Sequence, residues 1–224
     1  MTAHFHRELD ILKESILSLG LRVEEAIARA VSSTINRDKK LAGEVIAADS
    51  EINSREVRIE EECLKLLALY QPLAADLRFI IAALKINNDL ERMGDLAVNI
   101  AKGTLRMVEA PPIELPADFE EMSVKVRSMI KRSLQSLVNG DLALAYQVCA
   151  DDDAVDNMRR SLNVRTEAHM CRMSDETDPL VTLFLSVGHL ERIADMATNI
   201  AEDVIYMLEG RIIRHMEVGK AKGP

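Results

Sequence analysis

An internal duplication constrains the fold of this chain more than any other feature of its sequence. The segment 90–101 (LERMGDLAVNIA) returns as 190–201 (LERIADMATNIA), displaced by 100 positions. An earlier stretch, 36–49, shares seven identical residues with 139–152 at an offset of 103. Compositional likeness between amphipathic helices explains matching apolar residues, but not Glu, Arg, Asp and Asn recurring in one order. The chain therefore holds two copies of one unit.

Each copy has three long segments with apolar residues at helical spacing. In the first copy they span 4–36, 38–69 and 73–108, and in the second 118–138, 141–173 and 179–209. Aromatic residues make up only 3% of the chain and no segment has the alternation of a strand. We expect an all-α fold of two tandem three-helix bundles, six long helices in total.

Helix boundaries follow from capping residues and prolines. Asp38 and Asp141 are predicted N-caps of the second helix in each copy, Asp118 is a predicted N-cap of the fourth helix, and Gly210 ends the last. Prolines break the chain between the copies. The predicted domains are a first bundle at 1–109, a Pro-rich linker at 110–116, a second bundle at 117–210 and a C-terminal tail at 211–224.

Charge and composition exclude several classes of function. The net charge of −9 argues against nucleic-acid binding and against adhesion to an anionic membrane. No apolar run is long enough to insert into a bilayer, and the N-terminus lacks a signal-peptide pattern. The three cysteines are far apart and form no CxxC pair, which favours a reducing compartment. We expect a cytoplasmic protein, and the apolar faces of its long helices favour a homodimer.

Acidic residues recur at equivalent positions beside a predicted apolar face. On the third helix of each copy this face comprises Leu90, Met93, Ala97, Ile100 and Leu105, and then Leu190, Ile193, Ala197, Ile200 and Val204. Glu91 and Asp95 lie four residues apart and about 100° round the helix from this face, as do Glu191 and Asp195. Like charges at this spacing destabilise a helix slightly, so a reason for keeping both pairs is needed.

The second helix of each copy adds a further polar row. It contains Asp49 and Asn53 in the first copy and Asp152 and Asp156 in the second. If the rows of consecutive helices face each other, oxygen ligands converge in each copy and suit Mg²⁺, Mn²⁺, Ca²⁺ or iron, with Zn²⁺ also possible. In the alternative interpretation, arginines 92 and 192 or nearby lysines pair with the carboxylates on a solvated surface.

The chain resembles the PhoU family over nearly its whole length, from about residue 5 to residue 210. The resemblance rests on five stretches: 71–78 (QPLAADLR), 84–86 (LKI), 90–95 (LERMGD), 189–195 (HLERIAD) and 199–202 (NIAE). It implies a regulator that restrains the phosphate-starvation response when phosphate is plentiful. It also implies two partners, the ATPase subunit of the phosphate ABC transporter and a phosphate-sensing membrane histidine kinase.

The resemblance further implies metal binding through the acidic motifs. By position, the first site would use Asp49, Glu91 and Asp95, with Asn53 in place of a carboxylate. The second site would use Asp152, Asp156, Glu191 and Asp195. Because the first site then has one charge fewer, we expect it to bind metal more weakly.

Three functions compete at this point. The first is a regulatory adaptor that binds partners without catalysis. The second is a metal-dependent phosphohydrolase, although no general base or oxyanion donor set is evident. The third is a metal-binding or purely structural helical protein.

Overall fold

The computed structural model describes residues 2–172 and 177–211. These residues form six helices: α1 (Thr2–Ile35), α2 (Lys39–Tyr70), α3 (Ala74–Met107), α4 (Ala117–Asn139), α5 (Leu142–Met170) and α6 (Thr177–Glu209). The predicted all-α fold of two three-helix repeats is confirmed, and within the described ranges there is no strand. Helix α5 ends at Met170, earlier than the predicted 173, which itself lies outside the described residues.

Two of the three predicted N-caps are confirmed. The carboxylate of Asp38 accepts hydrogen bonds from the backbone N–H groups of Lys40 and Leu41 at 2.9 and 3.0 Å. Asp141 accepts one from the backbone of Leu144 at 3.0 Å. Gly210 follows α6 with a φ of 70°, a left-handed conformation that glycine adopts without strain.

The prediction that Asp118 caps the fourth helix is wrong. Helix α4 begins one residue earlier, at Ala117, and its N-cap is Pro116, which makes no side-chain capping bond. Asp118 lies inside the first turn, where its Oδ2 accepts a hydrogen bond from Arg165 Nη1 of α5 at 2.5 Å. An ion pair with the neighbouring helix therefore takes the place of the cap.

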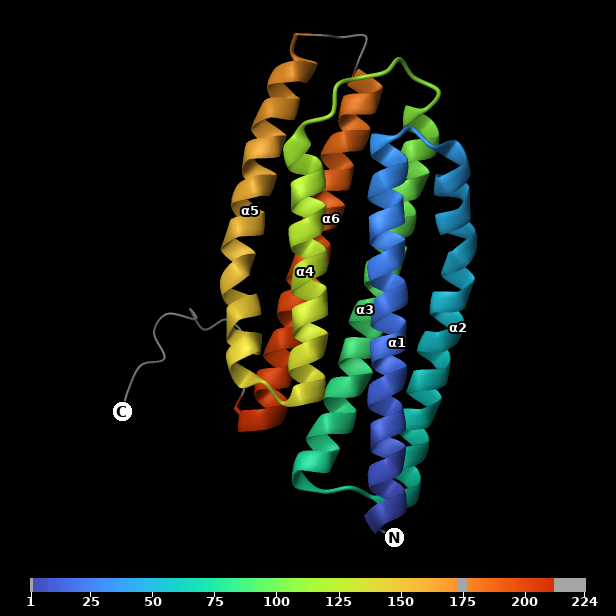
Figure 1. Cartoon of the computed structure of the whole chain (residues 1–224), viewed down its shortest axis with the longest axis vertical. Helices are drawn as coiled ribbons and strands as arrows, with labels where there is room; N and C mark the ends of the chain where they lie inside the picture. Colours follow the sequence, from blue (N-terminus) through green and yellow to red (C-terminus); the bar gives the residue numbers. More distant parts are fainter. Residues whose placement is uncertain (1, 173–176, 212–224) are drawn as a thin grey trace, which may run out of the picture.

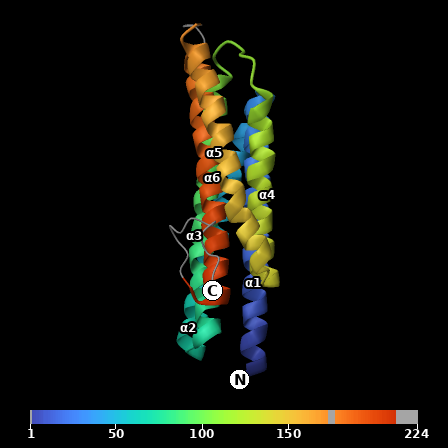
Figure 2. The same cartoon turned by 90° about the vertical axis from the view of Figure 1, so that its left-hand side faces the viewer.

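The helices form two layers. Helices α2, α3, α6 and α5 lie side by side in one layer, and α1 and α4 cover one face of it (Figure 1, Figure 2). At the centre of the larger layer α3 and α6 run antiparallel, so the two repeats meet about an approximate twofold axis. The two covering helices also contact each other, and Arg127 of α4 donates a hydrogen bond to Glu24 of α1 at 3.2 Å.

A single hydrophobic core runs through both repeats. The predicted apolar faces of α3 and α6 lie in it with nine of ten members buried, the exception being Leu105. The corresponding core position on α3 is Thr104, which is fully buried and shares a 2.7 Å hydrogen bond with the hydroxyl of Thr34. The hydrogen-bonded Thr104 therefore occupies the buried position that the apolar pattern assigned to Leu105.

The linker between the repeats is held by Arg37, whose guanidinium donates to the carbonyl oxygens of Val108 and Ala110 at 3.2 and 2.6 Å. The predicted division into domains 1–109 and 117–210 follows this linker but remains a prediction, because the core is continuous across it. Most of the predicted tail, from residue 212 on, lies outside the described residues.

Candidate functional site

Helices α2 and α3 approach closely at the acidic row of the first repeat. Gly94 of α3 faces α2 so tightly that a Cβ at this position would lie 3.2 Å from Ile52 Cγ2 and 3.9 Å from Asp49 Oδ1. The absence of a side chain at residue 94 therefore lets Asp49 lie directly beside the turn between Glu91 and Asp95. The predicted meeting of the two rows is present in this repeat.

The carboxylate of Asp49 is only partly satisfied. Asn53 Nδ2 donates a hydrogen bond to Asp49 Oδ2 at 3.1 Å. Oδ1 of the same carboxylate is buried and has no hydrogen-bond partner among the residues that the structure describes. A buried acceptor without a donor is unfavourable, and a bound cation would remove this penalty.

Glu56 belongs to the same cluster, although it is not among the site residues predicted from the sequence. The pKa of Glu91 is raised mainly by burial and then by the negative charges of Asp95, Glu56 and Asp49. Glu56 Oε1 accepts a hydrogen bond from Asn87 Nδ2 at 3.1 Å, which fixes its side chain beside α3. Glu56 follows Asp49 by seven residues, two turns along one face, so helical spacing alone could have identified it.

Helices α5 and α6 bring the second acidic row together, and here two arginines join it. Arg159 Nη1 donates to Glu191 Oε1 at 2.6 Å, and Arg160 Nη2 donates to Asp156 Oδ2 at 3.4 Å. Both arginines belong to α5. The protein itself thus supplies countercharge to this cluster.

The remaining two carboxylates of the second cluster are close to the first two. Asp152 Oδ1 accepts a hydrogen bond from Thr198 Oγ1 at 3.3 Å, and burial raises the pKa of Asp152. Burial and the negative charges of Glu191, Asp152 and Asp156 raise the pKa of Asp195 to about 6. The predicted four residues therefore share one electrostatic environment.

The two clusters differ in charge at equivalent positions. At the offset of 103, Glu56 corresponds to Arg159 and Val57 corresponds to Arg160. Each cluster has four carboxylates, but within the described part of the chain none of those in the first repeat forms an ion pair. Glu56 adds a fourth carboxylate to the first cluster, beyond the predicted set in which Asn53 replaces a carboxylate, and the expectation of weaker metal binding in the first repeat stays a prediction.

The donor chemistry of both clusters fits a hard cation, since every candidate ligand is an oxygen. Among the described residues, however, no three His, Cys, Asp or Glu side chains converge as ligands of one metal ion. Metal binding would therefore require the carboxylates to change rotamer, most simply around the unpartnered Asp49 Oδ1. Metal binding stays a prediction on these grounds.

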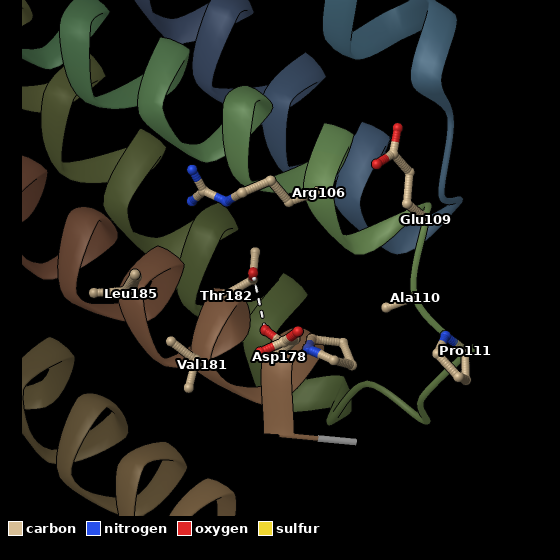
Figure 3. A pocket seen from close by; sticks show the side chains of 9 residues that line it. Arg106, Glu109, Ala110, Pro111, Asp178, Val181, Thr182 and Leu185 are labelled. Carbon is tan, nitrogen blue, oxygen red and sulfur yellow. Dashed lines mark hydrogen bonds between the residues drawn. The ribbon is translucent and has the colours of Figure 1, made fainter. Parts of the chain in front are cut away.

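A separate hollow of about 630 Å³ lies at one end of the layer (Figure 3). The end of α3 and the start of the linker form one side of this hollow, with Arg106 and Glu109. The first turns of α6 form the other side. Thr182 Oγ1 there donates to the carbonyl oxygen of Asp178 at 3.1 Å, an ordinary bond within a helix. None of the predicted site residues lines this hollow.

The helices that the structure describes include no segment with the length and apolar character needed to cross a bilayer. The two acidic clusters lie within the larger helical layer, one on α2 and α3 and the other on α5 and α6.

The PhoU domain matches residues 16–104 and again 119–204, which places one domain in each repeat. A phosphate-specific transport system accessory protein PhoU homolog from Aquifex aeolicus is 38% identical over 217 residues, covering 97% of this chain and 98% of the relative. The accessory protein PhoU from Serratia marcescens is 31% identical and covers 96% of this chain and 89% of its own length.

Solved structures agree with these relatives. The crystal structure of PhoU from Pseudomonas aeruginosa superimposes with a TM-score of 0.88 at 32% identity, covering 92% of this chain and all of that chain. The phosphate transport system regulatory protein PhoU from Streptococcus pneumoniae gives 0.86 at 31% identity, covering 93% and 98%. The duplicated acidic helices, the domain matches and these structures agree, and the chain belongs to the PhoU family.

Proposed function

We propose that this protein is a negative regulator of the phosphate-starvation response that acts as an adaptor and catalyses no reaction of its own. A role in the regulation of phosphate transport follows from its family. The finer proposal is that it works in the cytoplasm between the ATPase subunit of a phosphate ABC transporter and a phosphate-sensing membrane histidine kinase. The observation that supports it best is alignment, over nearly the full chain, with proteins named as transport accessory proteins.

The architecture suits regulation by contact. Two repeats packed around one continuous core form a stiff body whose surface is made of long helix faces. Such a body can change the activity of a partner by binding one of its two states more tightly than the other. A shift of the partner from almost fully inactive to almost fully active requires about 10⁴-fold tighter binding to the active state.

We also propose that the acidic clusters bind metal ions and that the first repeat binds them more tightly. The ligands would be Asp49, Glu56, Glu91 and Asp95 with Asn53 in the first repeat, and Asp152, Asp156, Glu191 and Asp195 in the second. A bound cation would supply countercharge that Arg159 and Arg160 already supply in the second repeat. Iron, Mg²⁺, Mn²⁺ and Zn²⁺ remain the candidates, with oxygen ligation favouring the harder ions.

Deletion of the gene tests the regulatory role. We expect phosphate-starvation genes to become constitutively expressed in high phosphate, and a plasmid copy of the gene to restore repression. Repression that is unaltered by the deletion would remove the proposal. Phosphate release from a phosphoester that disappears in Glu191→Ala would instead favour the metal-dependent phosphohydrolase.

Two biochemical measurements refine the same proposal. We expect the transporter ATPase subunit or the kinase to co-purify with the full chain, and this contact to persist after metal removal with EDTA. Light scattering tests the homodimer, which would have twice the chain mass of 25.0 kDa. A mass of one chain at micromolar concentration would contradict the dimer.

A further inference from the structure

A polar groove of about 330 Å³ lies between the two acidic clusters, where α3 and α6 run past each other. Its polar lining comes in pairs related by the duplication: Arg92 with Arg192, Asp95 with Asp195, and Asn99 with Asn199. Because the helices are antiparallel, the paired residues lie on opposite walls. A ligand in this groove would meet the same polar groups from two sides.

The two arginines are available to a ligand. Within the described residues neither Arg92 nor Arg192 forms a hydrogen bond or an ion pair, unlike Arg159 and Arg127, which are paired with Glu191 and Glu24. The charges of Arg92 and Arg192 still lower the pKa of Glu91 and Glu191, so the alternative in which these arginines neutralise the acidic rows holds in part, without an ion pair among the described residues. Two guanidinium groups, each a planar fork of N–H donors, are left facing solvent.

We propose that this groove binds a tetrahedral oxyanion such as inorganic phosphate between Arg92 and Arg192. Guanidinium groups match the geometry of oxyanions in two-pronged hydrogen bonds. Asn99 and Asn199 add amide donors, one from each wall. A tetrahedral anion has oxygen atoms pointing toward both walls at once, whereas a single carboxylate has only two oxygens in one plane.

The two aspartates of the groove set the conditions for binding. Asp95 and Asp195 repel an anion, so affinity is low until their charge is offset. Metal ions bound at the acidic clusters would offset the charge of these two aspartates. Only this metal dependence rests on the proposed function. We expect phosphate to bind weakly in EDTA and more tightly in Mg²⁺.

Equilibrium dialysis of the full chain against labelled inorganic phosphate, in EDTA and in Mg²⁺, tests the groove. Arg92→Gln and Arg192→Gln are each expected to weaken binding about tenfold, equally because the duplication makes them equivalent, and the double variant to abolish it. Arg92→Lys keeps the charge but loses the fork, so an intermediate loss is expected. Arg7→Gln, an exposed arginine at the far end of α1, is the control and should bind as the unaltered chain does.

Several results would overturn the inference. They are absence of phosphate binding in both buffers, binding that survives in the double variant, and competition by acetate as strong as competition by sulfate. Equal phosphate affinity in EDTA and Mg²⁺, lost in the double variant, would uphold the groove and count only against the metal part of the proposed function. Circular dichroism of each variant confirms that loss of binding is not loss of fold.

Discussion

The two acidic clusters share one backbone plan but balance their charge differently. In the second repeat Arg159 donates to Glu191 at 2.6 Å, so a cation is built into the site. In the first repeat the equivalent residue is Glu56, which adds to the negative potential that raises the pKa of Glu91. At this pair of equivalent positions the first cluster has a carboxylate and the second has a guanidinium, although negative charge in the second cluster still raises the pKa of Asp195 to about 6.

The seam between the repeats differs at its two ends in a similar way. Near one end Lys85 of α3 donates to Asp203 of α6 at 3.0 Å. The residue equivalent to Asp203 at the offset of 100 is Gly103, which packs directly against Thr182 of α6. The duplication repeats the scaffold, while charge and side-chain size at equivalent positions distinguish the two halves.

The largest effect is expected from filling the tight end of this seam. A Cβ at Gly103 would lie 2.9 Å from Thr182 Cγ2, so Gly103→Leu forces α3 and α6 apart and should lower the free energy of unfolding by about 3 kcal/mol. Gly188→Leu in the interior of α6 is the control, because nothing lies within 4 Å of a Cβ there. Urea unfolding measures the free energy of unfolding of both variants. An equal decrease in the two would show that the packing between α3 and α6 is not tighter at Gly103.

Much of the fold could be predicted from the sequence because it depends on local signals. The periodic apolar segments gave six helices, and the side chains of Asp38 and Asp141 cap their helices as expected. The misassignments at Asp118 and Leu105 have a tertiary cause. Asp118 is drawn to Arg165 on another helix, and the core position near Leu105 belongs to a hydrogen-bonded threonine.

The candidate site shows the same division. The four-residue spacing of Glu91 and Asp95 placed the acidic rows correctly, since this spacing defines one face of a helix. Which further side chains reach those rows depends on how α2 and α5 are rotated against their neighbours. Glu56 and Arg159 occupy the same face as the predicted residues, but only the packed structure shows that they contact the adjacent helix.

The next largest effect tests the charge difference directly. Glu56→Arg would give the first cluster the countercharge of the second, and we expect Mn²⁺ affinity of the full chain to fall about 30-fold, on the order of 2 kcal/mol. Glu60→Arg makes the same change of charge at an exposed position one turn along α2 and serves as the control. Calorimetric titration measures the Mn²⁺ affinity of both variants. An equal fall in the two would show that the net charge of the chain, and not the position of residue 56, causes the effect.

The reciprocal change should give a smaller effect of opposite sign. In the Glu56→Arg background, Arg159→Glu removes the ion pair to Glu191 and adds a carboxylate to the second cluster. We expect Mn²⁺ affinity to recover about tenfold, because the second repeat then has the uncompensated charge. The control is Arg7→Glu in the same Glu56→Arg background, which should not restore Mn²⁺ affinity. If Arg159→Glu does not restore it either, the second cluster cannot bind the ion.

The smallest effect concerns pH and is specific to the second repeat. The pKa of Asp195 is raised to about 6 from an ordinary value of 3.8, so the folded chain binds this proton more tightly than the unfolded chain does. The associated stability is complete below pH 3.8 and is lost as the pH rises through 6. Because the side chain of Asp195 is only partly shielded from water, solvent screening reduces the effect to about 1 kcal/mol.

Asp195→Asn isolates this contribution from the other carboxylates of the chain. In EDTA, we expect the free energy of unfolding of the variant to exceed that of the unaltered chain by about 1 kcal/mol at pH 7, with the difference shrinking toward pH 4. Urea unfolding of both proteins across this range measures the difference at each pH. A constant difference would mean that Asp195 keeps its ordinary pKa, and the crowding of negative charge at this cluster would then have no effect on folding.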